Sequence, residues 1–416
     1  MRPALTPSAP NGGTALYERF VARQPIFDER LKVFAYELLF RAGPQNIFQP
    51  RKDASSRVIA DSTTLFDLQT LTGNAKAFIN VDDSAILTGA ARLLPPQRIV
   101  AEILETVNPT PEIVKACEAL CADGYVLALD DFVDHPKWAP LLPLAKFLKV
   151  DFRASDSEKR QDIAKRYRSN GRHLLAEKVE TQEDVKEARK LGYSFFQGYF
   201  FCKPVMVSGK DIPGNKLTYL RLLEAIAAPE ISYPKIEQLL KHEPSLVYKL
   251  LRYLNSPLVG LRIEIHGVRE AIALLGDREF RRWVSVVAVA SMAADKAPEL
   301  IRTALTRAYF CEEFSTLVGM SEEKSDLFLL GLLSVVDALL DQPIEQILSS
   351  VPVAAEVREA LTGNSNRFRH VYDTLLAYEQ ADWNKLTRVT ETFPTVETHV
   401  PSCYLAAAGR ANLMSQ

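Results

Sequence analysis

Polar and charged side chains recur near the ends of short apolar segments in this 416-residue sequence. Glu37 and Asn80, for example, each follow a run of aliphatic and aromatic residues. An ionisable group in such a segment is costly to bury unless it is paired or binds a metal ion. The full set comprises Glu37, Asn80, Glu102, Asp130, Asp131, Lys149, Asp151, Glu177, Glu180 and Gln197.

Two interpretations of this set are open. Six or more carboxylates brought to one place would repel one another unless cations lay among them, and their oxygens suit Mg²⁺, Mn²⁺ or Ca²⁺ better than zinc. The alternative is an internal salt-bridge network around Lys149 and Arg41. We expect the divalent-metal site.

The adjacent pair Asp130-Asp131 indicates what such a site would do. One aspartate can bridge two metal ions about 3.5–4 Å apart, an arrangement that activates water and stabilises in-line displacement at phosphorus. Arg41, four residues after Glu37, would either clamp a phosphate oxygen with its guanidinium group or pair with a neighbouring carboxylate. The pattern favours phosphodiester hydrolysis.

The elements that must position these residues are short, β-branched and aromatic segments of the kind found in parallel strands covered on both faces. Between them lie helical segments with clear ends: Thr110-Pro111 begins one, and Thr181 and Gly192 flank another. Such alternation predicts an α/β (β/α)8-type barrel. An open doubly wound sheet is the alternative, but no Gly-rich loop follows its first strand. The expected strands are 33–41, 75–81, 99–105, 126–132, 147–152, 173–179 and 195–201.

The periodicity divides the chain into two domains. A Pro- and Ala-rich tail (1–17) precedes the barrel (18–204), and a Gly- and Pro-containing linker (205–216) follows it. From 217 to 416 the apolar residues recur at helical spacing, which predicts a separate all-α domain.

Composition narrows the class of protein. The chain has 47% apolar and 25% charged residues and a net charge of −2, with no basic excess of the kind that nucleic-acid binding requires. Its longest apolar stretches are too short to cross a bilayer, and its five cysteines are typical of reduced thiols. We therefore expect a cytoplasmic protein without a nucleic-acid or membrane partner.

The motifs in the first half, taken in order, resemble those of EAL-domain cyclic-di-GMP phosphodiesterases from about residue 20 to 204. They are Glu37-Leu38-Leu39-Phe40-Arg41, Phe78-Ile79-Asn80, Glu102-Ile103-Leu104-Glu105, Asp130-Asp131-Phe132, Lys149-Val150-Asp151, Ala176-Glu177-Lys178-Val179-Glu180 and Gln197-Gly198-Tyr199.

The resemblance implies a role for each site residue. Glu37, Asn80, Glu102 and Asp130 would hold one Mg²⁺ or Mn²⁺ ion, and Asp131 a second. Lys149 would position or deprotonate the attacking water, with Glu177 and Glu180 in support. The residues implied to contact or border the dinucleotide are Arg41, Asp151, Gln197 and Pro204.

The sequence departs from that family at three places. Residues 133–138 replace a glycine-containing turn and include Pro136, Leu104 stands where a threonine is usual, and Lys178 where glycine is usual. Without glycine, the turn cannot easily adopt left-handed conformations. We expect the second metal position to be weak and hydrolysis to be slow.

The second half resembles the HDOD domain, an all-α relative of metal-dependent HD phosphohydrolases, at residues 239–244, 250–257 and 265–276. An HD hydrolase needs an adjacent His-Asp pair, but Ser334 and Val335 follow Gly331-Leu332-Leu333 here. This half is expected to be non-catalytic. The combination resembles the YuxH-type EAL–HDOD signalling proteins of bacteria.

Two functions are consistent with the sequence. The first is a phosphodiesterase that opens cyclic-di-GMP to the linear dinucleotide. The second is an inactive cyclic-di-GMP sensor or protein-interaction adaptor. In either case the expected partners are cyclic-di-GMP, a signalling protein that contacts the HDOD domain, and a second copy of the chain as a homodimer.

Overall fold

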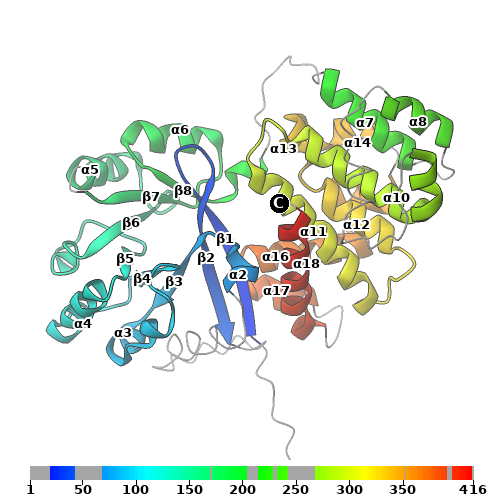
Figure 1. Cartoon of the computed structure of the whole chain (residues 1–416). Coiled ribbons are helices and arrows are strands. Elements are labelled where there is room, and N and C mark those ends of the chain that lie inside the picture. Colours follow the sequence, from blue (N-terminus) through cyan, green and yellow to red (C-terminus); the bar gives the residue numbers. More distant parts are fainter. Residues whose placement is uncertain are drawn as a thin grey trace, which may run out of the picture.

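The chain forms a β-barrel followed by a helical domain, and both were predicted from the sequence (Figure 1). The computed structural model describes residues 19–42, 68–168, 171–203, 214–227, 232–241, 268–351, 353–390 and 396–414. The predicted tail 1–17 and most of the predicted linker lie outside these residues. The last three linker residues are already helical, because α7 begins at Gly214.

Eight strands close the barrel in chain order, with β1 next to β8. Neighbouring strands are parallel from β2 to β8, whereas β1 runs antiparallel to both β2 and β8. The strands are β1 (Arg19–Phe27), β2 (Val33–Ala42), β3 (Lys76–Val81), β4 (Ile99–Ile103), β5 (Val126–Leu129), β6 (Ala145–Asp151), β7 (His173–Glu177) and β8 (Phe195–Gln197).

Strand β1 is absent from the seven segments expected for the (β/α)8-type barrel, and it runs antiparallel, whereas a parallel sheet was predicted. Its centre, Arg23-Gln24-Pro25, interrupts the apolar pattern by which the other strands were recognised. Pro25 is tolerated because β1 pairs with β8 only at Ile26 and Phe27.

The barrel helices begin and end at residues that stabilise helix termini. Thr110 accepts a hydrogen bond from the Ile113 amide at the start of α4, and Thr181 forms a capping box at the start of α6. Gly192 ends α6 at a positive φ of 95°. The helices are α2 (Leu68–Thr72), α3 (Asp83–Thr88), α4 (Pro111–Ala122), α5 (Ser157–Tyr167) and α6 (Gln182–Leu191).

All described elements beyond residue 213 are helical, as expected for this half. At Gly331 of α12 a β-carbon would lie 2.3 Å from the Arg307 carbonyl oxygen of α11, so this helix crossing requires glycine. The helices are α7 (Gly214–Ala227), α8 (Tyr233–Lys241), α10 (Val268–Met292), α11 (Pro298–Leu317), α12 (Lys324–Leu333), α13 (Val336–Leu340), α14 (Ile344–Ser350), α15 (Ala355–Leu361), α16 (Arg367–Glu379), α17 (Trp383–Thr390) and α18 (Val400–Met414).

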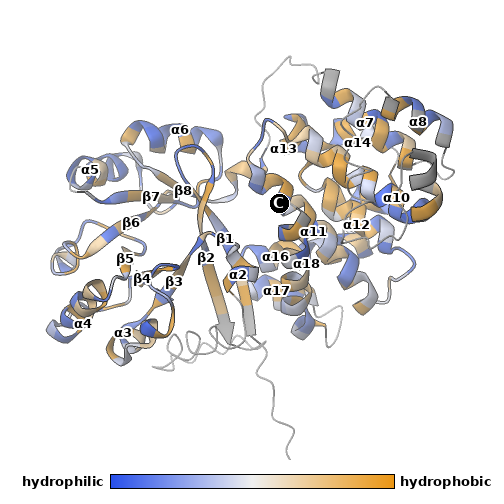
Figure 2. Ribbon diagram, in the orientation of Figure 1, coloured by the Kyte–Doolittle hydropathy of each residue, from blue (hydrophilic) through white to orange (hydrophobic). Residues whose placement is uncertain are grey.

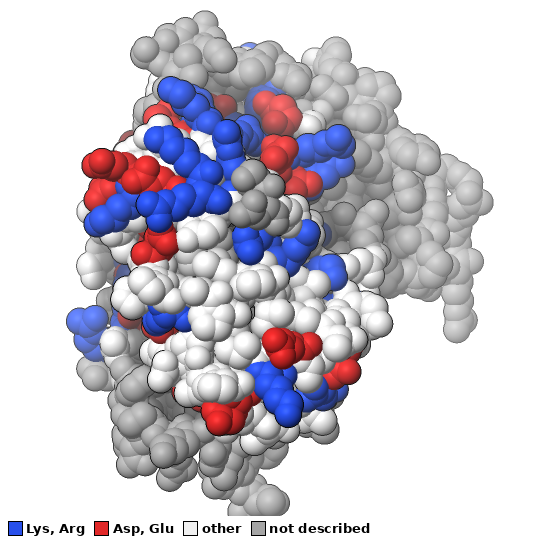
Figure 3. Space-filling view, turned by 90° about the vertical axis from the view of Figure 1, so that its left-hand side faces the viewer, with Lys and Arg blue, Asp and Glu red and all other residues white. Residues whose placement is uncertain are grey.

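Hydropathy follows this architecture. Apolar residues lie along the barrel strands and on the inner helices of the second domain, while the outer helices α5 and α6 are mainly hydrophilic (Figure 2). Charges of both signs gather over these two helices on the outer face of the barrel (Figure 3). None of the helices that the structure describes combines the length and apolar character needed to span a membrane.

The two domains meet at β1 and β2, which face α11, α16 and α18 (Figure 1). The Tyr36 hydroxyl of β2 donates to Glu299 Oε2 of α11 at 2.8 Å. At the end of α18, Asn412 Nδ2 donates to the Thr70 carbonyl oxygen of α2 at 2.9 Å. These contacts hold the helical domain against the strands that open the barrel.

Candidate functional site

Two layers of side chains fill the barrel interior. The lower layer is apolar and takes one residue from each strand: Ile26, Ala35, Phe78, Val100, Ala128, Phe147, Leu175 and Phe195. Side chains two positions apart on a strand share a face, so the next layer is set by the same register. The next layer is entirely polar. It lies two residues further toward the carboxyl ends of β2–β8 and two residues back along antiparallel β1.

We call this second layer the polar ring. It lies at the carboxyl ends of the parallel strands, where barrel enzymes build their active sites. Its members are Gln24, Glu37, Asn80, Glu102, Asp130, Lys149, Glu177 and Gln197. The structure thus brings together seven of the predicted site residues from seven strands, and adds Gln24.

Lys149 occupies the centre of the polar ring. Its ammonium nitrogen lies 2.8 Å from Glu177 Oε1, 3.1 Å from Asp130 Oδ1 and 3.5 Å from Glu37 Oε2. It also donates to Glu102 Oε1, and both of these side chains are fully buried. One ammonium therefore faces four carboxylates, so the ring holds more negative than positive charge.

Amide side chains complete the ring next to Glu37. Gln197 donates from Nε2 to Glu37 Oε2 and, at 3.1 Å, to Gln24 Oε1. Gln24 and Glu37 are directly paired across β1 and β2. Three strands thereby fix the orientation of the Glu37 carboxylate.

The charge excess appears in the pKa values of the ring. Burial raises the pKa of Glu177 to about 8, against the opposing effect of Lys149, and it raises the pKa of Glu102 well above its ordinary value. Burial alone would depress the pKa of Lys149, but the surrounding carboxylates raise it well above its ordinary range. Without a further cation, the ring retains protons on carboxyl groups.

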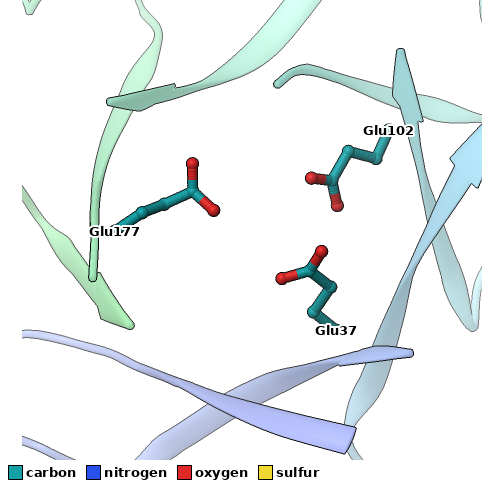
Figure 4. Close-up of side chains that lie close together, drawn as sticks. All are labelled: Glu37, Glu102 and Glu177. Carbon is teal, nitrogen blue, oxygen red and sulfur yellow. The ribbon is translucent and has the colours of Figure 1, made fainter. Parts of the chain in front are cut away.

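Several buried oxygens of the ring lack a hydrogen-bond partner: Asn80 Oδ1, Glu102 Oε2, Glu177 Oε2 and Gln197 Oε1. Leaving such atoms unpaired is unfavourable by about 1–3 kcal/mol each. Carboxylate oxygens of Glu37, Glu102 and Glu177 lie within 4.8 Å of one another and point toward a common centre (Figure 4). Converging unpaired oxygens fit a hard divalent cation, so the residues present suit such an ion.

A second carboxylate group lies beside the first. Oxygens of Glu105, Asp130 and Asp131 also fall within 4.8 Å of one another, in a more exposed position. Asp130 contacts Lys149 and belongs to the ring, while Asp131 has a left-handed backbone with φ of 39°. Burial and the neighbouring Asp130 charge raise the pKa of Asp131.

A cavity of about 400 Å³ opens directly above the polar ring. Its floor includes Glu37, Asp130, Glu177 and Gln197. Its rim is built by Asp131, Arg153, Lys178, Glu180, Tyr199 and Gln380, among others. Bases, acids and amides thus surround a space that can admit a polar ligand of small-molecule size.

Comparison with known proteins identifies both domains. The EAL domain pattern matches residues 18–204, and the HDOD domain pattern matches residues 212–351. Over 373 residues the chain is 34% identical to the cyclic di-GMP phosphodiesterase CdgJ of Vibrio cholerae, covering 88% of this chain and 86% of that protein. The chain belongs to the EAL–HDOD family.

A second relative matches over nearly its whole length. Bacillus subtilis YuxH, an uncharacterised protein, is 31% identical over 398 residues, covering 93% of this chain and 97% of that one. Among solved structures, the calcium and cyclic-di-GMP complex of Klebsiella pneumoniae BlrP1 matches with 21% identity and a TM-score of 0.39. That match covers 46% of this chain and 57% of the BlrP1 chain.

Besides Asp131, two predicted EAL site residues lie outside the polar ring. Asp151 accepts hydrogen bonds from Lys178 Nζ and from the Arg153 and Ala154 amides. Glu180 is half-exposed and pairs with Lys203 at 3.3 Å, because the chain turns at Lys178 (φ 53°) after β7 ends. The structure therefore does not bring Glu180 to the ring oxygens.

The glycine-free loop of the EAL domain follows a path fixed by its own side chains. The short 3-10 turn Pro136–Trp138 is capped by His135, whose Nδ1 accepts from the Lys137 amide. Trp138 is fully buried, and Asp134 accepts from the Tyr167 hydroxyl at 2.6 Å. The loop is thus anchored at both ends.

In the helical domain, an ion pair joins α11 to α16, which lies beyond the residues that match the HDOD pattern. The Arg307 guanidinium of α11 donates to Glu379 of α16, at 2.7 Å for the shortest contact, and to Ser334 Oγ at 3.2 Å. Arg307 and Glu379 are both buried. Ser334 is the residue that follows Gly331-Leu332-Leu333, so this buried pair occupies the vicinity of the missing histidine.

Some predicted features lie outside the described residues. These are Pro204, the side chain of Arg41, and most of the HDOD motifs between residues 242 and 267. Other site residues were missed from the sequence. Gln24 lies in the unrecognised strand β1, Arg153 carries no motif, and Gln380 comes from the other domain, so no local pattern identifies them.

Proposed function

We propose that the chain is a cyclic-di-GMP signalling protein. Its EAL domain would bind a divalent cation and slowly hydrolyse cyclic-di-GMP to the linear dinucleotide, and its HDOD domain would pass the binding state to a partner protein. The observation that carries this proposal is the polar ring: four carboxylates around one lysine, with unpaired buried oxygens, beneath an open cavity. The 34% identity to CdgJ supports the choice of substrate.

Glu37, Asn80, Glu102 and Asp130 are the residues that would hold Mg²⁺ or Mn²⁺. The ion would act as a Lewis acid toward the phosphate and lower the pKa of water. The Glu105, Asp130 and Asp131 group would offer a weaker second position, because it is more exposed and lies close to the Lys178 charge.

Lys149 would orient the attacking water rather than deprotonate it. Its raised pKa keeps it an ammonium, which is a hydrogen-bond donor only. Glu177 contacts Lys149 and has a pKa of about 8, and the bound ion would displace its proton, so the resulting carboxylate can accept the proton that water releases. The water oxygen then bonds to phosphorus, one ester P–O bond breaks, and the departing ribose oxygen takes up a proton.

A direct assay tests this proposal. The full-length protein is incubated with Mn²⁺ or Mg²⁺ and cyclic-di-GMP, while calorimetry follows binding and chromatography follows the linear product. Glu102→Gln should lose metal binding and turnover. Glu118→Gln, the same change at an exposed position of α4, should behave as the wild type. Lys149→Met should retain dinucleotide binding and lose turnover.

The outcomes separate the candidate functions. Binding together with slow, metal-dependent product formation supports the proposal. Tight binding without product supports the sensor alternative. The Lys178–Asp151 ion pair favours this alternative, because it places the Lys178 ammonium beside the second carboxylate group. No binding of cyclic-di-GMP by the wild type would refute both.

A further inference from the structure

The cavity above the polar ring has a wall from each domain. All but one of its lining residues belong to the barrel; the exception is Gln380, which directly follows α16 of the helical domain. Gln380 is exposed and shares the cavity with Glu37 and Glu177. A ligand that fills this cavity would therefore touch both domains.

The end of α16 is anchored on the barrel. The fully buried Tyr378 hydroxyl accepts a hydrogen bond from the Val21 amide at 3.1 Å and donates one to the Val21 carbonyl oxygen at 2.8 Å. On the edge of β1 that faces β8, backbone pairing is limited to Ile26 and Phe27. The Tyr378 hydroxyl therefore provides the hydrogen-bond partner for the Val21 amide and carbonyl groups that β8 does not provide.

An ion pair and a backbone turn within the helical domain fix the residues on either side of Gln380. Glu379 forms the buried ion pair with Arg307. Ala381 adopts a left-handed backbone with φ of 54°, which a residue with a β-carbon rarely does. The helix therefore stops abruptly after Glu379, and Gln380 is held at the cavity.

The same strand links this anchor to the polar ring. Val21 and Gln24 both lie on β1, and Gln24 contacts Gln197, which contacts Glu37. On β2, Tyr36 binds Glu299 of α11 and is followed directly by Glu37. The helical domain thus contacts both β1 and β2, the strands that orient Glu37 of the proposed metal site.

We propose that Gln380 is a ligand-binding residue of the EAL site, so that the helical domain completes the cyclic-di-GMP cavity and senses its occupancy. This inference rests on the proposed function. The Gln380 amide is uncharged and offers both a donor and an acceptor, so it suits a neutral base or sugar edge of the dinucleotide rather than a phosphate. The phosphate would face the polar ring instead.

The test compares Gln380→Ala with Gln346→Ala, the same truncation at an exposed position on α14. Calorimetry on the full chain with Mn²⁺ should show a cyclic-di-GMP dissociation constant raised about three- to tenfold in Gln380→Ala, the value of one hydrogen bond. Mn²⁺ affinity should be unchanged in both variants, and Gln346→Ala should bind the dinucleotide like the wild type.

A second measurement follows the anchor itself. Amide hydrogen exchange should slow at residues 376–382 when cyclic-di-GMP binds the wild type, with no change along α14. Tyr378→Phe removes the hydroxyl from Val21, so it should speed exchange at Val21 and weaken the protection of residues 376–382 by the ligand.

The outcomes distinguish this inference from the proposed function. If the wild type binds cyclic-di-GMP and Gln380→Ala binds it equally tightly, with no ligand protection at residues 376–382, the inference is refuted while the proposed function stands. If the wild type does not bind the dinucleotide at all, the proposed function fails and this inference fails with it.

Discussion

Metal binding to the polar ring should depend steeply on pH, because the ion must displace protons. Glu177 has a pKa of about 8 and faces Glu37 from β2, Glu102 from β4, Asp130 after β5 and Lys149 from β6. At about pH 6 its carboxyl group is almost entirely protonated. Only the ionised form places a negative charge beside the bound ion, so metal binding favours ionisation and each bound ion releases a proton.

The magnitude follows from that pKa. A single group with a pKa of about 8 reduces the apparent affinity about a hundredfold at pH 6 and about twofold at pH 8. The apparent association constant for Mn²⁺ should therefore rise about fiftyfold over this range and level off above it. The raised pKa of Glu102 should steepen the change.

Isothermal titration with Mn²⁺ in two buffers of different ionisation enthalpy measures both the affinity and the number of protons released. Glu177→Gln should lose most of the pH dependence, since an amide does not titrate in this range. Glu183→Gln, at an exposed position of α6, should keep it. An affinity that stays constant from about pH 6 to about pH 8, with no proton release, would refute this account of the ring.

Further predictions concern stability and the second metal position. Because the folded-state pKa of Glu177 is raised, the metal-free native state binds more protons than the unfolded chain between about pH 4.5 and pH 8. The free energy of unfolding, measured by urea denaturation, should therefore fall across this window by on the order of 1 kcal/mol per pH unit. Lys149→Met leaves the ring carboxylates without their ammonium and should lower the metal-free stability by about 3–5 kcal/mol, with much of the loss recovered on adding Mn²⁺. Lys178→Gly removes the ammonium beside Asp151 and suits the left-handed backbone, so the Mn²⁺ stoichiometry from spin-resonance titration should rise from one toward two; an unchanged stoichiometry would contradict the assigned role of Lys178. Arg307→Met leaves the buried Glu379 carboxylate unpaired and should lower the free energy of unfolding by about 3–5 kcal/mol in urea denaturation. The double variant with Glu379→Met should recover most of that stability.

Strand positions were predictable where side chains alternate in a simple pattern. The apolar layer and the polar ring differ by two residues in every strand, so one polar or charged residue per apolar segment was enough to find most of the ring. Helix ends were equally clear, because Thr110, Thr181 and Gly192 have local roles that depend only on neighbouring backbone atoms.

The rest depended on contacts between distant segments. Strand β1 was missed because it pairs in the opposite direction and carries Arg23 and Pro25, both of which face the other domain. Gln24 joins the ring only through its pairing with Glu37, and Gln380 reaches the cavity only because Tyr378 attaches α16 to β1. A single sequence contains no local signal for such long-range pairings.

The two domains also show how a cation site differs from a structural ion pair. In the polar ring four carboxylates face one ammonium, and oxygens of Glu102 and Glu177 remain unpaired. In the helical domain one guanidinium faces one carboxylate, and Arg307 also donates hydrogen bonds to the hydroxyl groups of Ser334 and Tyr372. The first arrangement is incomplete without an added positive charge, whereas the second is already balanced. The excess of buried negative charge therefore favours a cation site in the EAL domain, whereas the balanced pair favours a structural role in the helical domain, although both clusters are polar and buried.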